Sequence, residues 1–210
     1  CQAILGGGAS AASYFSLLHI ALTKSLEVSW EAVWGHKGNP AIATLAISYI
    51  VHDDTYYLAQ SIQSFSSAGQ VFVFVSRVPW HNVAGNWEHT AELAKEVGAE
   101  VVLGDWNSEL SHRQVARDHL LEQGYTHALI PDGDEIIEPQ LLDSLVKIAT
   151  TELAERVYCH WDTYWMSPEY VIRPREAFTP LILCDLRQAV PVNGRNYEGG
   201  RPLLLTPQHG

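Results

Sequence analysis

The sequence predicts an α/β domain with a mostly parallel central sheet flanked by helices. Short apolar runs rich in β-branched residues alternate with amphipathic segments, and this alternation is typical of parallel sheets with crossover helices. Hydrophobic residues make up 47% of the chain and charged residues 18%. A sizeable core is therefore expected, and disordered or fibrous classes are excluded. The length of 210 residues suits one large α/β domain or two small ones.

The first predicted strand covers residues 41–51, a nearly continuous apolar run with several β-branched side chains. A strand of this composition is buried on both faces of its sheet. A helix is expected over residues 56–66, because apolar side chains recur there at helical spacing, and Gly69 ends it. Residues 71–75 alternate Val and Phe and predict the second strand.

Helices and strands continue to alternate along the next part of the chain. The remaining expected elements are a helix at 88–97, a strand at 98–103, a helix at 111–123, a strand at 127–130 and a helix at 139–154. In parallel sheets of this kind, ligands bind beyond the carboxyl ends of the strands. The residues that directly follow each strand are therefore the first candidates for a functional site.

Residues 1–39 precede this unit, and a linker with two glycines and a proline, residues 35–40, joins the two parts. We expect a strand-helix segment or the tail of an upstream domain. Glycines 6–8 and the small residues 9–11 fit the strand, G-x-G-x-x-A, helix pattern of a dinucleotide fingerprint. So short a segment cannot form a complete dinucleotide-binding domain, which favours the accessory interpretation. The sequence starts at Cys1, and we expect a processed or partial chain.

Composition also limits the partners. With 13 basic and 24 acidic side chains the net charge is −11, and a field of this sign repels nucleic acid. The uncharged residues 2–23 contain three consecutive glycines and several polar side chains, so no stable membrane span is expected. The three cysteines have neither metal-site nor disulfide spacing, which indicates a cytoplasmic location. Because the chain is acidic, a phosphorylated ligand would need a local positive charge, such as a divalent cation, to bind.

Three carboxylates follow the fourth predicted strand, in the sequence Pro131-Asp132-Gly133-Asp134-Glu135. Hard oxygen ligands grouped in this way suit Mg²⁺ or Mn²⁺, and the cation can bridge to phosphate oxygens. The same pattern fits an acidic turn in which Asp134 or Glu135 caps the next helix. Spacing alone leaves both interpretations open.

The order of motifs from residue 41 to about 145 resembles the nucleotide-sugar-binding half of a GT-A fold glycosyltransferase, close to the family 2 type. That family has an apolar strand, a short polar motif and a helix. Further along come an arginine-containing helix, a glycine, a strand and Asp-x-Asp-[Asp/Glu]-x-x-x-Pro. The matching segments here are 46–51, 52–54, 58–64, 116–118, Gly124, 127–130 and 132–139. The resemblance implies a metal-dependent transfer of sugar from a nucleotide-diphosphate sugar.

The resemblance also implies roles for individual residues. The stretch expected to contact the nucleotide base and ribose comprises Tyr49, His52, Asp53 and Asp54. Asp132 matches the aspartate that meets the ribose or the metal. Asp134 matches the ligand that links Mn²⁺ or Mg²⁺ to the diphosphate. His209 resembles a later histidine that completes the metal shell, although a chance histidine there is the alternative.

Further assignments are less specific. Arg113 and Arg117 lie one helical turn apart, and either matches the family's arginine or is a surface ion-pair partner. Glu198 is the candidate catalytic base by chain order, as an inverting transfer needs a carboxylate to accept the acceptor's proton. Residues 76–79 replace the acidic turn that the family uses for the base, which leaves the nucleotide open.

We divide residues 40–210 into a nucleotide-sugar half, 40–150, and an acceptor-side half, 151–210, which we expect to be truncated at its end. Residues 157–172 are rich in Trp and Tyr, so they predict either a sugar-stacking surface or a packed core. Residues 171–210 hold five arginines against three acids, and this basic stretch could help to hold a diphosphate. The expected acceptor is a carbohydrate or a lipid-linked molecule.

Two other functions remain open. A non-catalytic carbohydrate- or nucleotide-sugar-binding domain would explain the altered turn and the lack of a clear base. A sugar nucleotidyltransferase also uses paired aspartates with Mg²⁺. It normally needs a glycine-rich, basic loop after its first strand, where this chain has His52-Asp53-Asp54.

Overall fold

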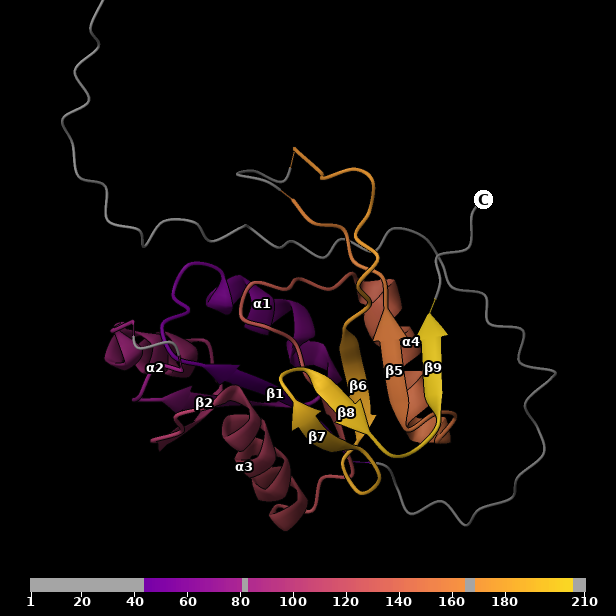
Figure 1. The fold of residues 1–210 in the computed structure, drawn as a ribbon, viewed down its shortest axis with the longest axis horizontal. Helices are drawn as coiled ribbons and strands as arrows, with labels where there is room; N and C mark the ends of the chain where they lie inside the picture. The colour runs from indigo at the N-terminus through magenta and orange to yellow at the C-terminus, as the bar shows by residue number, and fades with distance from the viewer. Residues whose placement is uncertain (1–43, 81–82, 165–168, 206–210) are drawn as a thin grey trace, which may run out of the picture.

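The centre of the fold is a seven-stranded mixed sheet with helices on both faces (Figure 1). The computed structural model describes residues 44–80, 83–164 and 169–205. The strands of the sheet are β1 (Leu45–Val51), β2 (Gln70–Ser76), β3 (Glu100–Gly104), β4 (His127–Leu129), β5 (Arg156–Cys159), β6 (Leu181–Asp185) and β9 (Pro202–Leu205). The predicted glycine fingerprint at residues 6–11 lies outside the described residues.

The spatial order of the strands is β3-β2-β1-β4-β6-β5-β9. Strands β1 to β4 are mutually parallel, β6 is antiparallel to both β4 and β5, and β9 is parallel to β5. The prediction of an α/β fold with a mostly parallel sheet is therefore confirmed. Strands from both proposed halves of the chain share this one sheet. The loops after β1, β2, β3, β4 and β5 consequently lie along one edge, which we call the C-terminal edge.

Four α-helices match the four predicted ones. They are α1 (Leu58–Phe65), α2 (Trp87–Glu96), α3 (Glu109–Glu122) and α4 (Pro139–Thr151), and a short 3₁₀ turn, η2 (Ser66–Ala68), extends α1. The side chains of Asn86 and Ser108 cap α2 and α3, and Pro139 opens α4. Within the described residues, none of the helices has the length and apolarity needed to cross a membrane.

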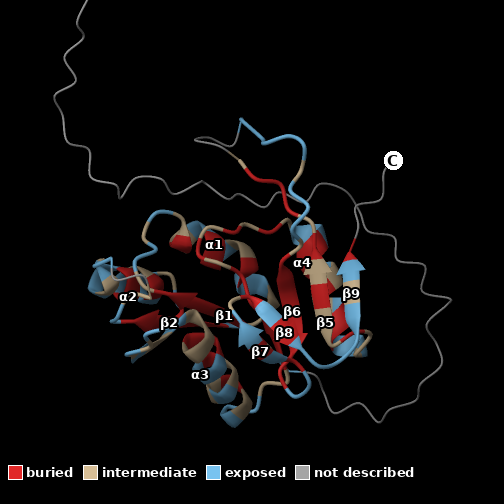
Figure 2. Cartoon of the chain, viewed as in Figure 1, coloured by how far each residue is buried: buried red, intermediate tan, exposed pale blue. Residues whose placement is uncertain are grey.

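Two hydrophobic cores fill the two faces of the sheet. On one face Ile47, Tyr49 and Val51 of β1 pack with α1, α2 and α4. On the other face Ala46 and Ile50 pack with α3 and with the hairpin of β7 (Val190–Asn193) and β8 (Asn196–Glu198). Successive side chains of a strand alternate between faces, and both faces of β1 are covered, so its sequence is apolar throughout. Figure 2 shows the resulting buried centre.

His112 of α3 is completely buried in an aromatic cluster beside the second core. Its ring stacks on Trp106 with centroids 4.3 Å apart, and Trp80 meets it edge-on at 5.5 Å. Burial lowers the pKa of His112 to about 3. The folded protein therefore keeps this imidazole neutral at pH values where an exposed histidine is already protonated.

We expect the free energy of unfolding to fall as the pH decreases from 6.5 toward about 3. In this window the unfolded chain binds a proton at His112 and the folded chain does not. Replacing the residue, His112→Phe, should reduce the slope by up to about 1.4 kcal/mol per pH unit. Urea denaturation at several pH values measures it. The exposed His89→Gln is the control, and an unchanged slope in His112→Phe would contradict the expectation.

Candidate functional site

The C-terminal edge brings together carboxylates from the loops after β1 and β4. Asp54 follows β1, while Asp132 and Asp134 follow β4. The two loops touch, because a methyl group added to Gly133 would lie only 3.1 Å from Cβ of Asp54. Glycine at this position therefore permits the close approach of the two acidic loops.

Arg195 is a buried cation at this edge, and it comes from the turn of the β7–β8 hairpin. Only 7% of its side chain is exposed. Its Nη1 donates to Oδ2 of Asp132 at 2.9 Å and to Oε1 of Glu135, and its Nη2 donates to Oε2 of Glu135 at 2.8 Å. Its Nε donates to the carbonyl of Leu181 at 3.0 Å. The hairpin is thus tied to the loop after β4 by charge-assisted hydrogen bonds.

Glu135 is the completely buried partner of Arg195. Its Oε2 also accepts a hydrogen bond from the backbone N–H of Asp132 at 3.1 Å. Its carbonyl accepts one from the hydroxyl of Ser61, which in turn is 2.9 Å from the hydroxyl of Tyr49. Glu135 therefore holds the acidic loop from the inside, and α1 and β1 support it.

Arg113 approaches the other oxygen of Asp132. It is 4% exposed and lies one turn after Glu109, the first residue of α3, to whose Oε1 its Nε donates at 2.9 Å. Its Nη2 lies 3.5 Å from Oδ1 of Asp132. Burial alone would raise the pKa of Asp132, but the guanidinium groups of Arg195 and Arg113 outweigh this effect and lower it. Asp132 is therefore an ionised carboxylate held by two arginines.

Asp134 is placed differently from Asp132. Within the described residues it has no salt-bridge partner. Burial, followed by the charges of Asp132 and Glu135, raises the pKa of Asp134 to about 7. Asp54 is exposed beside it and accepts only a long hydrogen bond, 3.4 Å, from the backbone of His52. The edge thus carries two carboxylates whose charge no basic side chain of the described residues neutralises.

These two carboxylates suit a divalent cation that a ligand helps to bind. Across the parts of the chain that the structure describes, no group of three or more His, Cys, Asp and Glu side chains is arranged to hold a metal ion. Mg²⁺ commonly uses one or two protein carboxylates and completes its shell with water and phosphate oxygens. The donor set of Asp54 and Asp134 fits this second kind of site.

The neighbouring strand ends place two more of the predicted nucleotide-binding residues. The Nδ1 of His52 donates to the carbonyl of Ser76 at 2.7 Å, which joins the ends of β1 and β2. Asp53 is exposed and lies against Gly85. Arg77, in the turn that departs from the family pattern, forms an exposed ion pair with Asp105 at 2.7 Å. The loops after β1, β2 and β3 therefore lie next to one another, with His52 and Asp53 among them.

Other predicted site residues lie away from the acidic loops. Tyr49 is completely buried in the core that faces α1, where it supports Ser61. Glu198 is exposed on β8, and pairs with Val190 at the end of the hairpin away from Arg195. His209 lies outside the described residues.

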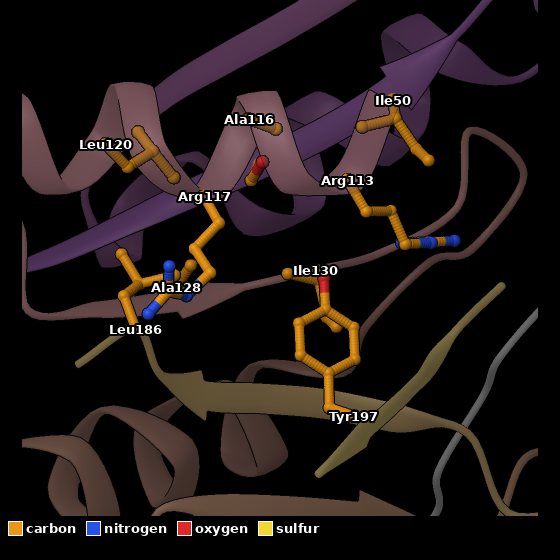
Figure 3. A pocket seen from close by; sticks show the side chains of 10 residues that line it. Ile50, Arg113, Ala116, Arg117, Leu120, Ala128, Ile130, Leu186 and Tyr197 are labelled. Carbon is orange, nitrogen blue, oxygen red and sulfur yellow. The ribbon is translucent and has the colours of Figure 1, made fainter. Parts of the chain in front are cut away.

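Arg117 also points away from the acidic loops. Its Nε donates to the carbonyl of Ala189 at 3.1 Å, and its Nη1 pairs with Asp118. It lines a small pocket beside α3, and Tyr197 of β8 lines the same pocket (Figure 3). The pocket is lined by Ser48, Ile50, Arg113, Ala116, Arg117, Leu120, Ala128, Ile130, Leu186 and Tyr197. Arg113 alone of the two predicted arginines reaches Asp132.

Sequence reasoning missed the roles of Arg195 and Glu135. The excess of arginine in residues 171–210 was the one available signal. It does not single out Arg195, because four other arginines share this stretch, and one of them, Arg187, pairs instead with Asp185 and Glu152. Contact across 60 residues depends on the hairpin folding back over the sheet.

No protein-family model matches the sequence, and no curated protein matches it. Solved structures with partial similarity include S. aureus TarS, at 10% identity and TM-score 0.40, covering 56% of this chain and 21% of that one. TarS 1–349 in complex with UDP gives 12% identity, TM-score 0.35, and covers 56% of this chain and 35% of that one. This chain therefore spans about a fifth to a third of those proteins.

A further similar structure is 4-diphosphocytidyl-2C-methyl-D-erythritol synthase from Anaerococcus prevotii DSM 20548. It is 9% identical, with a TM-score of 0.40, and the alignment covers 69% of this chain and 72% of that one.

We expect Arg195→Met to lower the free energy of unfolding by about 3–5 kcal/mol, because it leaves the buried Glu135 charge without a partner. Thermal or urea denaturation measures the loss. Arg77→Met is the matched control, since it breaks an ion pair whose side chains are 45% and 57% exposed. That change should cost less than about 1 kcal/mol. Equal losses in the two variants would contradict the structural role of Arg195.

Proposed function

We propose that this chain is the nucleotide-sugar-binding part of a metal-dependent glycosyltransferase. The reaction would move a sugar from a nucleotide-diphosphate sugar to a carbohydrate or lipid-linked acceptor. The observation that carries the proposal is the close approach of Asp54 to Gly133, in the loop that also holds Asp134, at the C-terminal edge of the sheet and beside an Asp132 held by arginines. The motif order of residues 41–145, which resembles the GT-A family 2 type, supports the same proposal.

The chemistry explains why a cation would be needed. Negative charge develops on the leaving nucleoside diphosphate as the glycosidic bond breaks. Arg113 and Arg195 already pair with Glu109, Asp132 and Glu135. The proposal assigns Asp134 and Asp54 as the residues that hold Mn²⁺ or Mg²⁺, and such an ion, when bound, neutralises diphosphate oxygens as a Lewis acid.

The loops after β1 and β2 would hold the nucleoside. The hydrogen bond from His52 to the carbonyl of Ser76 fixes the histidine ring at the strand ends. Asp53 is exposed next to it, so its carboxylate is available to accept hydrogen bonds from ribose hydroxyls or base N–H groups. These residues would orient the donor, while Asp54 and Asp134 would hold the cation that binds its charged part.

The acceptor would approach over the segment after β5, because β5 ends at the same edge. In this segment Tyr170 is 65% exposed and Phe178 51% exposed, and exposed aromatic faces can stack on sugar rings. Asp162 is a carboxylate of the same segment, but it is unsuitable as the base that accepts the proton of the acceptor hydroxyl. Its Oδ1 already accepts hydrogen bonds from both Arg173 and Arg175 at 2.8 Å.

A non-catalytic binding domain on the same fold is the second candidate. The position of Glu198 favours it, because this predicted base lies at the end of the hairpin away from the acidic loops. Transfer or hydrolysis of any nucleotide sugar in a donor panel would exclude the non-catalytic function.

The proposed function predicts that the chain binds a nucleoside diphosphate in a manner that depends on Mn²⁺ or Mg²⁺. Calorimetric titration with UDP, GDP, ADP, CDP and dTDP, in Mn²⁺ and in EDTA, measures this. Asp134→Asn should weaken binding by at least about tenfold, or 1.4 kcal/mol. The exposed Asp143→Asn of α4 is the control and should bind as the parent chain does.

Two results would count against this prediction. Equal affinity in EDTA and in Asp134→Asn would remove the metal role. Failure to bind every nucleoside diphosphate and every nucleotide sugar tested would overturn the proposed function.

A further inference from the structure

We propose that Arg195 is a positioning residue, which fixes the carboxylate of Asp132 for ligand binding while Glu135 serves as its counter-charge. The inference rests on the proposed function, because it concerns the same edge of the sheet. It adds a residue from the β7–β8 hairpin that acts on the ligand through Asp132.

The hydrogen bonds of Arg195 exceed what a purely structural ion pair requires. Glu135 is completely buried and already pairs with two nitrogens of the guanidinium group. The additional bond from Nη1 goes to Asp132, whose side chain is 42% exposed at the edge. Arg195 thus reaches from the buried interior to a carboxylate that a ligand can contact.

Asp132 is held from two directions. Arg195 of the hairpin binds Oδ2 at 2.9 Å, and Arg113 of α3 lies 3.5 Å from Oδ1. Rotation of the carboxylate would weaken both contacts, so its orientation is set before any ligand arrives. Side chains locked by a supporting shell in this way bind ligands without a further loss of conformational freedom.

Arg195 is itself held firmly. Its Nε donates to the carbonyl of Leu181, and its guanidinium carbon lies 5.9 Å from the centre of the Trp161 ring. The preceding Gly194 has a φ of +50°, and a Cβ there would be 3.2 Å from Oε2 of Glu109. Glycine therefore allows both the turn and its close contact with the start of α3.

The pairing also divides the acidic residues into two groups. Asp132 and Glu135 share Arg195, and Asp132 also faces Arg113. Asp134 and Asp54 have no such partner among the described residues. Arg195 therefore holds the Asp132 carboxylate in one orientation, and the proposed cation would bind to Asp134 and Asp54.

A double-mutant cycle tests this role. Arg195→Met combined with Glu135→Gln removes both buried charges, so the fold loses less stability than with Arg195→Met alone. We expect this double variant and Asp132→Asn each to weaken Mn²⁺-dependent binding of the panel's best nucleoside diphosphate by about tenfold. The triple variant should bind no more weakly than Asp132→Asn, because Arg195 acts through Asp132.

A matched control is Arg201→Met with Glu155→Gln, which removes a different ion pair of the same half of the chain. It should leave nucleotide affinity unchanged. Parent-like affinity in the Arg195→Met, Glu135→Gln variant, or losses that add in the triple variant, would overturn the positioning role.

The outcomes separate this inference from the proposed function. If the parent chain binds no nucleoside diphosphate, the proposed function fails and the inference fails with it. If the parent chain binds a nucleoside diphosphate but the affinity losses of the double variant and of Asp132→Asn add in the triple variant, only the positioning role of Arg195 fails. Should the double variant not fold, Arg195→Lys replaces it. Lysine keeps the charge that Glu135 needs but lacks the planar fork that reaches Asp132, so weakened binding supports the role and parent-like binding overturns it.

Discussion

The burial of Arg195 against Glu135 is the interaction on which the site depends. An unpaired charge in this position would cost several kcal/mol, so the hairpin can occupy its place over α3 only when the loop after β4 presents its carboxylates correctly. The strand order places β6 beside β4, and this brings the C-terminal part of the chain to the acidic loop. The same ion pair therefore assembles the fold and orders Asp132.

The charges at the C-terminal edge explain how a chain of net charge −11 could still bind a phosphorylated ligand. The two arginines that contact Asp132, Arg113 and Arg195, are both occupied by acidic side chains of the protein itself. They fix one carboxylate, and they leave Asp54 and Asp134 without a basic partner. Under the proposed function, such an edge would repel a free diphosphate and accept one accompanied by a divalent cation.

Much of this arrangement can be predicted from local sequence. The apolar run of β1, the helical spacing of α1 and the position of Asp132 directly after β4 are local signals, and the structure confirms the elements they predict. The contact of Arg195 with Glu135 spans 60 residues, so no local pattern in the sequence predicts it. Tyr49 is predicted from the motif to contact the nucleotide. Side chains alternate between the two faces of a strand, however, and Tyr49 lies on the face of β1 that is buried in the core.

The most direct test of this account is the location of the cation. Crystals of the chain grown with Mn²⁺ and the nucleoside diphosphate that binds best would reveal manganese by its anomalous scattering. We expect a peak at the carboxylates of Asp134 and Asp54, with Asp132 still hydrogen-bonded to Arg195. A peak on Asp132 with Arg195 displaced, or no manganese at this edge in crystals that contain the nucleotide, would contradict it.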